Sequence, residues 1–274
     1  TDYQYLVAQA VTLGPDRGRD LSFSPDSNHV AVFARRERGR VLLLLDAIDG
    51  GIAREYDIAI DQPLSPAFSP DGTTIAFKGY ARGRGDIFLL DLASGAVRNF
   101  TDDEAYDSAP TFTPDGQAIV YSSQAAEGAK LFEAQLADAT KRRQLTFGPG
   151  NDEGAAFSRD GKRLYFASDR DADIFDIYGL DLEQRTLTRL TKVIGSALSP
   201  VPVPTREGER VVYQAYTKGR YLLYVADPAQ GTPVGTEEAP QEVTERTPYM
   251  PPVTVSVDPD KATPVKGRKL FADN

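Results

Sequence analysis

The side chains that most often carry out chemistry in proteins are scarce in this sequence. Histidine occurs once, as His29, and cysteine and tryptophan are absent from the 274 residues. A Ser-His-Asp triad needs a histidine beside its nucleophile, and a metal site built from histidines or thiolates needs several of them. The Gly-x-Ser-x-Gly turn of α/β-hydrolases is also missing. We therefore expect no catalytic residue and no cofactor site within this chain.

One run of aspartates resembles a metal-binding loop. In "SDRDADIFD", residues 168–176, the residues Asp169, Asp171 and Asp173 alternate as carboxylates do at the start of an EF-hand calcium loop. The glycine at the sixth position and the distal bidentate glutamate of that loop are missing. These aspartates are therefore weak calcium candidates, and a solvated turn is the alternative interpretation.

Charged residues of opposite sign are concentrated in separate loops. The segments "RRERGR" (35–40) and "RGRG" (82–85) are basic, whereas "TDDEAYD" (101–107) and "GPGNDEG" (148–154) are acidic. The candidate partner-binding residues in these loops are Arg35, Arg36, Arg38, Arg40, Arg82, Arg84, Asp102, Asp103, Asp107, Asp152 and Glu153. What they do together depends on the elements that carry them.

Those elements follow from an internal repeat. The turn acid of the repeated unit recurs as Asp26, Asp71, Asp115, Asp160 and Glu207, at intervals of 45, 44, 45 and 47 residues. Apolar residues recur four and six positions after each acid, which is the alternation of a β-strand. A period of about 40 to 50 residues is typical of solenoids, propellers and arrays.

Each unit has the pattern of four short antiparallel strands. In "PAFSPDGTTIAFKGYARGRGDIFLLDLASGAVRNFT", residues 66–101, apolar runs are separated by turn signals. Asp-Gly between such runs predicts a hairpin with a type I′ turn, in which both central residues have positive φ. We expect the aspartate to accept hydrogen bonds from its own turn rather than to bind a metal. Four such strands form the blade of a β-propeller.

The repeated unit resembles the TolB-type β-propeller repeat. The resemblance rests on "FSPDG", "IAF" and "DIFLLDLASG" in the second unit and on "FSRDGKRLYFASDRDADIFDIYGLDL" in the fourth, and it covers roughly residues 10–230. It implies an all-β propeller of four-stranded antiparallel blades over residues 1–231. It does not imply one function, because a fold of this kind supports many different sites.

The start of the chain is expected to close the ring. The last strand of the second unit ends at Thr101, eleven residues before Phe112 of the next inner strand. Thr12 precedes Phe23 by the same interval, so residues 8–14 are predicted to be a last strand. Five repeats are visible, and we infer that this strand completes the fifth blade. TolB-type rings more often have six blades, and a sixth would need more chain.

Alternating strand direction should bring the charged loops to one face. In a four-stranded blade, the loop between the second and third strands lies on the same face as the loop to the next blade. Basic loops would then occupy units one and two, and acidic loops units three and four. Opposite charges separated across one face favour a single orientation of a charged partner. For any single residue, a solvated loop is the alternative interpretation.

The sequence after residue 231 differs from the repeats. The segment "TPVGTEEAPQEVTERTPYMPP" is rich in Pro, Thr and Glu, so residues 232–274 are expected to be an extended linker that lies on or leaves the ring. The last ten residues, "VKGRKLFADN", resemble the segment that leads into a c-type cytochrome domain. Since the chain has no cysteine to hold haem c, we expect haem only in a continuation beyond Asn274.

Composition and charge limit the classes of molecule that this chain is expected to bind. A net charge of −9, from 31 basic and 40 acidic residues, argues against nucleic acid as a partner. The sequence has no run of 18 apolar residues, so it does not predict a transmembrane helix. We expect a non-catalytic propeller of the bacterial cell envelope, periplasmic or extracellular, that binds protein partners and docks or presents a c-type cytochrome domain. The alternatives are a gating propeller of a serine hydrolase or oligopeptidase and a carbohydrate-binding propeller with Tyr80 and Tyr106 as aromatic candidates.

Overall fold

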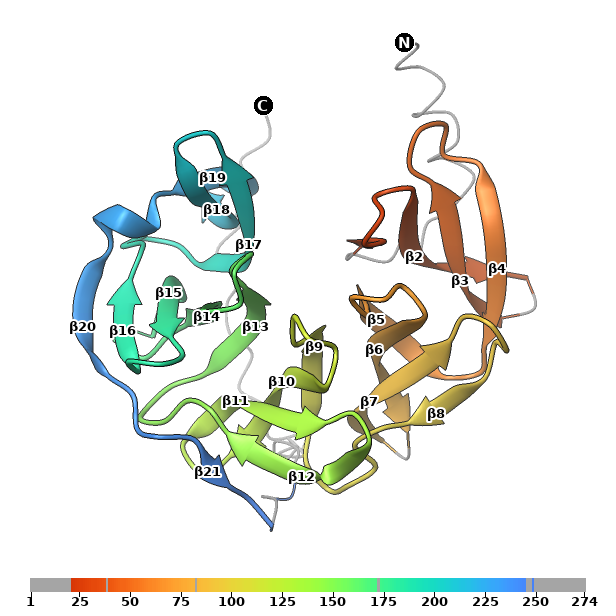
Figure 1. Ribbon diagram of the computed structural model, residues 1–274, viewed down its shortest axis with the longest axis horizontal. Helices are drawn as coiled ribbons and strands as arrows, with labels where there is room; N and C mark the ends of the chain where they lie inside the picture. The colour runs from red at the N-terminus through yellow and green to blue at the C-terminus, as the bar shows by residue number, and fades with distance from the viewer. Residues whose placement is uncertain (1–20, 38, 82, 172, 245–247, 249–274) are drawn as a thin grey trace, which may run out of the picture.

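The computed structural model describes residues 21–244, apart from residues 38, 82 and 172, together with residue 248. The described chain forms five antiparallel sheets and one short 3₁₀ helix, η1 (Pro228–Gln230). The sheets follow one another as the blades of a propeller, and blades one and five stand on either side of an opening (Figure 1). The predicted all-β propeller is thus confirmed, and the described residues form five blades, one of the two numbers that the sequence left open. Within the described residues, no helix is long and apolar enough to span a bilayer.

Each blade is a meander in which consecutive strands pair. Blade one contains β1 (Leu21–Phe23), β2 (His29–Arg36), β3 (Gly39–Asp46) and β4 (Ile52–Ile58). Blade two contains β5 (Asp61–Phe68), β6 (Thr74–Ala81), β7 (Arg84–Asp91) and β8 (Val97–Asn99). Blade three contains β9 (Asp107–Phe112), β10 (Ala118–Ala125), β11 (Gly128–Gln135) and β12 (Asp138–Gln144). Blade four contains β13 (Asp152–Phe157), β14 (Arg163–Ser168), β15 (Asp176–Asp181) and β16 (Thr186–Arg189). Blade five contains β17 (Ala197–Thr205), β18 (Gly208–Thr217) and β19 (Arg220–Ala226).

The chain after blade five returns along the outer rim of the ring. Strand β20 (Thr232–Thr236) pairs with β16, and β21 (Gln241–Glu242) pairs with β12, so blades four and three each gain a fifth strand. Figure 1 shows this segment, in blue, outside both blades. Blade five has three described strands, and the fourth that we expect from residues 8–14 lies outside the described residues.

The aspartates of the first four units cap their own turns, as expected, but the turn type differs from the predicted one. Asp71 Oδ1 accepts hydrogen bonds from Ser69 Oγ (2.6 Å) and from the Thr73 amide (3.0 Å). Positive φ is confined to the residue after the acid, which is Gly72 at 72°, and the Gly72 amide donates to the Ser69 carbonyl. The predicted type I′ turn is therefore wrong: the turn is type I, with Pro70 and the aspartate at its centre. Proline, whose φ is fixed near −65°, suits that position.

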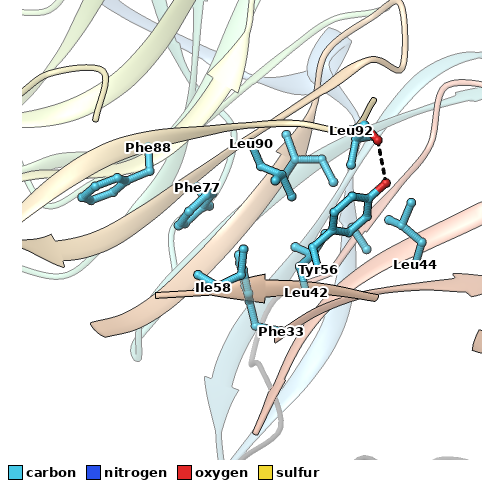
Figure 2. Packing of buried hydrophobic residues seen from close by; sticks show 11 residues of the cluster. Phe33, Leu42, Leu44, Tyr56, Ile58, Phe77, Phe88, Leu90 and Leu92 are labelled. Carbon is cyan, nitrogen blue, oxygen red and sulfur yellow. Dashed lines mark hydrogen bonds between the residues drawn. The ribbon is translucent and has the colours of Figure 1, made fainter. Parts of the chain in front are cut away.

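The core lies between blades. Each blade has a forward face, toward the next blade along the chain, and a backward face, and apolar side chains from the two faces meet at every junction. Between blades one and two, Phe33 and Leu42 pack near Phe77 (Figure 2). The Tyr56 hydroxyl donates to the Leu92 carbonyl (2.9 Å) across the same junction. Similar clusters fill the next three junctions, so each blade depends on its neighbours for burial.

A repeated contact fixes the last strand of blades two, three and four. At the end of each strand, a threonine hydroxyl accepts a hydrogen bond from an amide of the third strand. The residue before the threonine donates its own amide to the carbonyl of the same third-strand residue. The three pairs are Phe100-Thr101 on Ile87, Leu145-Thr146 on Leu131, and Leu190-Thr191 on Ile177.

Candidate protein-docking face

Hairpins between second and third strands contact the loops that lead to the next blade. The Ala129 amide donates to Asn151 Oδ1 (3.0 Å), and the Tyr216 amide donates to the Ser196 carbonyl (3.0 Å). These contacts place both kinds of loop on one side of the ring, as alternating strand direction predicts. We call this side the loop face. The opposite side, which carries the capped turns between first and second strands, is the turn face.

The basic residues of blade one gather at the β2–β3 hairpin on the loop face. Arg35 pairs directly with Arg40 across the hairpin, and Arg35 is exposed while Arg40 is half-buried. Arg36 forms an ion pair with Glu55 of β4 (3.2 Å). The hairpin therefore concentrates positive charge near its tip, and the Arg36–Glu55 ion pair ties it to β4 of its own sheet. The remaining predicted arginines, Arg38 and Arg82, lie outside the described residues.

The acidic loop after blade two is tied to its surroundings by ion pairs. Asp103 lies 2.7 Å from Arg142 Nη1, and Glu104 lies 3.9 Å from Arg84 Nη1. Asp102 and Glu104 are exposed, whereas Asp103 is half-buried. Because Arg84 meets Glu104, the basic loop of blade two and the acidic loop partly neutralise each other. The clearest separation of charge is thus between the hairpin of blade one and this loop.

Asp107 and Asp152 do not reach the surface, which corrects their predicted role in docking. Both are fully buried. Asp107 accepts a hydrogen bond from Ser123, and Asp152 is held by Arg170 Nη2 (2.9 Å) and Lys130 Nζ (3.5 Å). Each stands five residues before the phenylalanine of an inner strand, at the first position of that strand, and the blade junction covers that position. The charge of Asp152 therefore helps to hold blade four to blade three through Lys130.

Glu153, the residue after Asp152, faces the central channel. It lines a cavity of about 590 Å³ together with inner-strand residues of several blades. Burial and the nearby Asp169 carboxylate raise the pKa of Glu153, and the Lys78 ammonium opposes that rise. The residue is solvent-exposed where it lines the channel. Glu153 is therefore placed to meet a group that enters the channel.

Neighbouring junctions carry opposite charges at one equivalent position. The third-strand residue beside the next blade is Asp86 in blade two and Lys130 in blade three, and the next inner strand begins at Asp107 or Asp152. Burial raises the pKa of Asp86 to about 6. A hydrogen bond from Asn99 Nδ2 (2.9 Å) opposes this rise, and the charge of Asp107 adds to it. Sequence reasoning missed this exchange, although aligning "GDIFLLD" with "AKLFEAQ" displays it.

The two tyrosines named as carbohydrate candidates enclose a lysine. The rings of Tyr80 and Tyr106 are 6.1 Å apart at 64°, and their hydroxyls are hydrogen-bonded (2.7 Å). Lys78 Nζ is bonded to Tyr106 Oη (2.5 Å) and lies 5.0 Å and 4.4 Å from the two ring centroids. Burial opposes ionisation of Tyr80, but the bond to Tyr106 and the ammonium together lower its pKa. This arrangement satisfies a buried cation rather than presenting a flat ring to a sugar.

The calcium candidates bind separate protein groups. Asp169 accepts hydrogen bonds from the Asn151 amide (2.5 Å) and side chain (2.9 Å). Asp171 accepts from Tyr178 Oη (2.7 Å) and Arg189 Nη1 (3.1 Å). In the part of the chain that the structure describes, no three acidic or histidine side chains are arranged to hold a metal. The run is a hydrogen-bonded turn, with Asp173 in the left-handed region at φ 57°.

Inner strands of blades two to five share a bulge that lines the channel. Strand pairing shifts register there, and a residue at the equivalent position of each strand adopts a left-handed φ: Ser65, Ala109, Gly154 and Ser199. Strand β5 has a second left-handed residue, Gln62. Left-handed backbone is unfavourable for a residue with a Cβ and is tolerated where packing enforces it. Bulges bend a strand and re-aim its side chains. The sequence contains a weak signal for them, since Pro66, Pro110 and Pro200 follow the left-handed residue.

Comparison with known proteins identifies relatives of this architecture. The profile of the TolB beta propeller domain matches residues 48–234. A protein TolB homolog of Chlorobium luteolum is 42% identical over 50 residues, which is 18% of this chain and 12% of that protein. The structure of TolB from Acinetobacter baumannii superposes with a TM-score of 0.64 at 20% identity, over 81% of this chain and 55% of that one.

A further solved structure has the same fold in a different protein. Hydrazine synthase of Kuenenia stuttgartiensis superposes with a TM-score of 0.56 at 16% identity, over 79% of this chain and 65% of that one. At these identities, both structural likenesses establish the fold alone. The chain spans about half the length of the Acinetobacter TolB and matches a smaller part of the Chlorobium homolog.

Proposed function

Because the chain belongs to the TolB beta propeller domain family, we propose that it is a non-catalytic scaffold of the bacterial cell envelope that binds a protein partner through its loop face. The β-propeller fold itself supports many functions, so the proposal depends on the arrangement of groups on that face. A periplasmic or extracellular location accompanies the proposal, through the family resemblance.

The observation that carries the proposal is the separation of exposed charge on the loop face. The exposed Arg35 and the half-buried Arg40 lie at the hairpin of blade one, and the exposed Asp102 and Glu104 lie in the loop between blades two and three. On the same face, Ile194 in the loop before blade five is 98% exposed. Oriented charge around exposed apolar groups is what a protein partner recognises, because charges select orientation and apolar area adds affinity.

A finer proposal concerns the end of the chain. The resemblance of "VKGRKLFADN" to the lead-in of a c-type cytochrome domain supports a propeller that presents an electron-transfer domain. These residues lie outside the described part of the structure, and the chain has no cysteine for haem attachment. Haem staining of the protein purified from its source organism tests this extension: covalent haem on the same polypeptide supports it, and a haem-free polypeptide contradicts it.

Site-specific photo-cross-linking in the source bacterium tests the docking face. A photoreactive amino acid replaces Arg35 on the loop face or, as the matched control, Lys162 on the turn face; both side chains are exposed. We expect a protein adduct of defined mass from position 35 and none from position 162. Equal adducts at both positions, or an adduct at position 162 alone, would contradict docking through the loop face.

A further inference from the structure

A pocket opens on the loop face at the junction of blades four and five. It has a volume of about 610 Å³ and lies between the loop before β17 and the β18–β19 hairpin. Its walls include Val193, Ile194, Tyr213, Tyr216 and Tyr224. Pockets of this size, lined mainly by apolar and aromatic side chains, are typical sites for small organic groups. We call it the blade-five pocket.

Two of these tyrosines form a stacked pair that recurs in blades two to five. The ring centroids of Tyr213 and Tyr224 are 5.9 Å apart at 25°, and those of the equivalent Phe166 and Tyr178 in blade four are 6.1 Å apart at 22°. In blade four the Arg170 guanidinium lies 5.5 Å and 5.4 Å from the two ring centroids. That pair is 0% exposed, whereas Tyr224 is only half-buried. An arginine of the chain itself thus covers the pair in blade four, and the equivalent place in blade five is open.

The residues that hold the arginine in blade four are replaced in blade five. Arg170 donates to Asp152 Oδ1 (2.9 Å) and to Ser168 Oγ (3.0 Å). Asp152 and Ser168 pair directly across their strands, and the equivalent pair in blade five is Ala197 and Ala215. This position of blade five therefore offers no partner to a cation, and burying a charge without a partner is unfavourable. The space beside the two tyrosines suits an uncharged group.

The mouth of the pocket combines an exposed apolar side chain with one positive charge. Ile194 is 98% exposed. Lys218, at the tip of the β18–β19 hairpin, is exposed and is the only charged residue among the described residues that line the pocket. Gly195 lets the loop approach the hairpin closely, since a Cβ at this position would lie 2.3 Å from the Tyr216 carbonyl oxygen. The pocket thus has apolar walls, and an ammonium stands at its edge.

We propose that the blade-five pocket binds an aromatic side chain of the protein partner, with a carboxylate of the same partner segment placed against Lys218. The inference rests on the proposed function, because the occupant belongs to the partner that docks on the loop face. The tyrosines of the walls offer a new ring offset-stacked or edge-to-face contacts. Large aromatic side chains in pockets are also the usual anchors of protein interfaces. A carboxylate beside the ring is favoured over an ammonium because the Lys218 charge is the one that it meets.

Three small probes with the same ring and different charge test the chemistry of the pocket. Hydrocinnamate is negative, hydrocinnamamide is neutral and phenylpropylamine is positive. We expect hydrocinnamate to shift the NMR signals of the Val193 and Ile194 methyl groups and to bind about tenfold more tightly than the amine at low salt, with the difference shrinking as salt is raised. Tighter or equal binding of the amine, or no shift at Val193 and Ile194, would overturn the proposal.

A pair of isoleucine variants tests the location of the site. Ile194→Glu removes an apolar wall and places a carboxylate at the mouth, so we expect hydrocinnamate to bind about tenfold more weakly. Because Ile194 is 98% exposed, the variant should fold as the unmodified chain does. Ile48→Glu is the matched control, since Ile48 is 84% exposed in the β3–β4 turn on the turn face. Unchanged binding in Ile194→Glu, or equal losses in both variants, would contradict the assignment.

A photoreactive amino acid at position 194, with position 48 as the control, tests the occupant in the source bacterium. We expect the cross-linked partner segment, sequenced by mass spectrometry, to contain an aromatic residue beside Asp or Glu. A segment without an aromatic residue, or with basic residues around it, would overturn the proposal. An adduct at position 35 without one at position 194 would leave docking through the loop face intact and refute the role of the pocket, whereas no adduct at either position would contradict both.

Discussion

At the scale of single residues, the repeated aspartates organise turns. Asp71 accepts three hydrogen bonds from Ser69 and Thr73, and these bonds lower its pKa despite a small opposing effect of burial. Asp26, Asp115 and Asp160 have lowered pKa values for the same reason. A carboxylate that recurs in four successive units with the same local donors is explained by the turn alone, which is why repetition in sequence argues against a metal site.

Replacing Asp71 tests this turn role. We expect Asp71→Ala to destabilise the fold by about 1 kcal/mol at pH 7, the typical net contribution of such bonds at an exposed site. Because the folded pKa is lowered, this stability is present above the unfolded pKa near 3.8 and is lost as the pH falls through the folded pKa. Urea unfolding at pH 7 and pH 3 measures it. The exposed Asp57 of β4 provides the control, and an equal effect of Asp57→Ala would remove the turn from the explanation.

Residue patterns predicted the role of these aspartates but not the details around them. The Asp-Gly pair indicated a type I′ turn, whereas the preceding proline decides for type I because its φ is fixed negative. Asp152 was predicted to take part in docking because it stands in the acidic loop at residues 148–154, which was expected on the loop face. Its burial follows from Lys130 and Arg170, which come from distant parts of the sequence. Pairing of this kind is a tertiary contact, and local sequence carries little information about it.

At the scale of elements, the blade junctions are the units of stability, and their charges differ. The junction of blades three and four buries Lys130 and Arg170 against Asp152. At the junction of blades two and three, Asp86 is buried and the negative charge of Asp107 raises its pKa further. Among the described residues, Asp86 Oδ1 has no hydrogen-bond partner. The same kind of substitution should therefore have opposite effects at the two junctions.

We expect Asp86→Asn to stabilise the fold by about 1–2 kcal/mol at pH 7.5. This value is the free-energy equivalent of the pKa shift of Asp86, reduced to allow for screening by solvent. The pKa of Asp86 is about 6 in the folded chain and 3.8 in the unfolded chain. The protonated carboxyl therefore stabilises the fold fully below pH 3.8, and this stabilisation is lost as the pH rises through about 6. The gain from the variant should accordingly vanish near pH 4. Chemical denaturation across pH 4 to 8 measures it, and a destabilised Asp86→Asn at pH 7.5 would show that the ionised carboxylate is needed.

Asp152→Asn is the matched variant at the neighbouring junction. It leaves Lys130 and Arg170 buried with one carboxylate fewer, so we expect a loss of about 3 kcal/mol at the same pH. The two variants change charge by the same amount, which separates the effect of the junction from that of overall charge. Similar changes in stability for both would contradict the assignment of opposite junction charges.

At the scale of the whole molecule, the periodic turn acids and alternating apolar runs were enough to predict a propeller with five visible repeats, and they left a ring of five or six blades open. Each blade buries its faces against its neighbours, so every repeat contains the apolar pattern that the fold requires. The rim strands β20 and β21 were not predicted as part of blades four and three, because "TPVGT" lacks the apolar alternation of a blade strand. Glu237, buried against Arg170 and the Phe147 amide (2.9 Å), helps to hold that segment.

The loop face forms only when the blades assemble into a ring. The loops that carry Arg35 and Asp102 are distant in sequence, and their common side depends on strand direction in two blades. Of the predicted acidic docking residues, Asp102 is exposed on the loop face, whereas Asp107 and Asp152 are buried at blade junctions. The sequence therefore overestimated the negative charge available for docking. What remains is a smaller contrast between the hairpin of blade one and the loop after blade two.

The affinity for the partner captured by cross-linking at position 35 tests the central claim most directly. The variant Arg35→Glu with Arg40→Glu reverses charge on the loop face, and Arg159→Glu with Lys162→Glu makes the same change on the turn face. At low salt we predict binding about tenfold weaker for the first variant, with the difference shrinking as salt is raised, and unchanged binding for the second. Unaltered affinity in the first variant, with both variants folded, would contradict docking through the loop face.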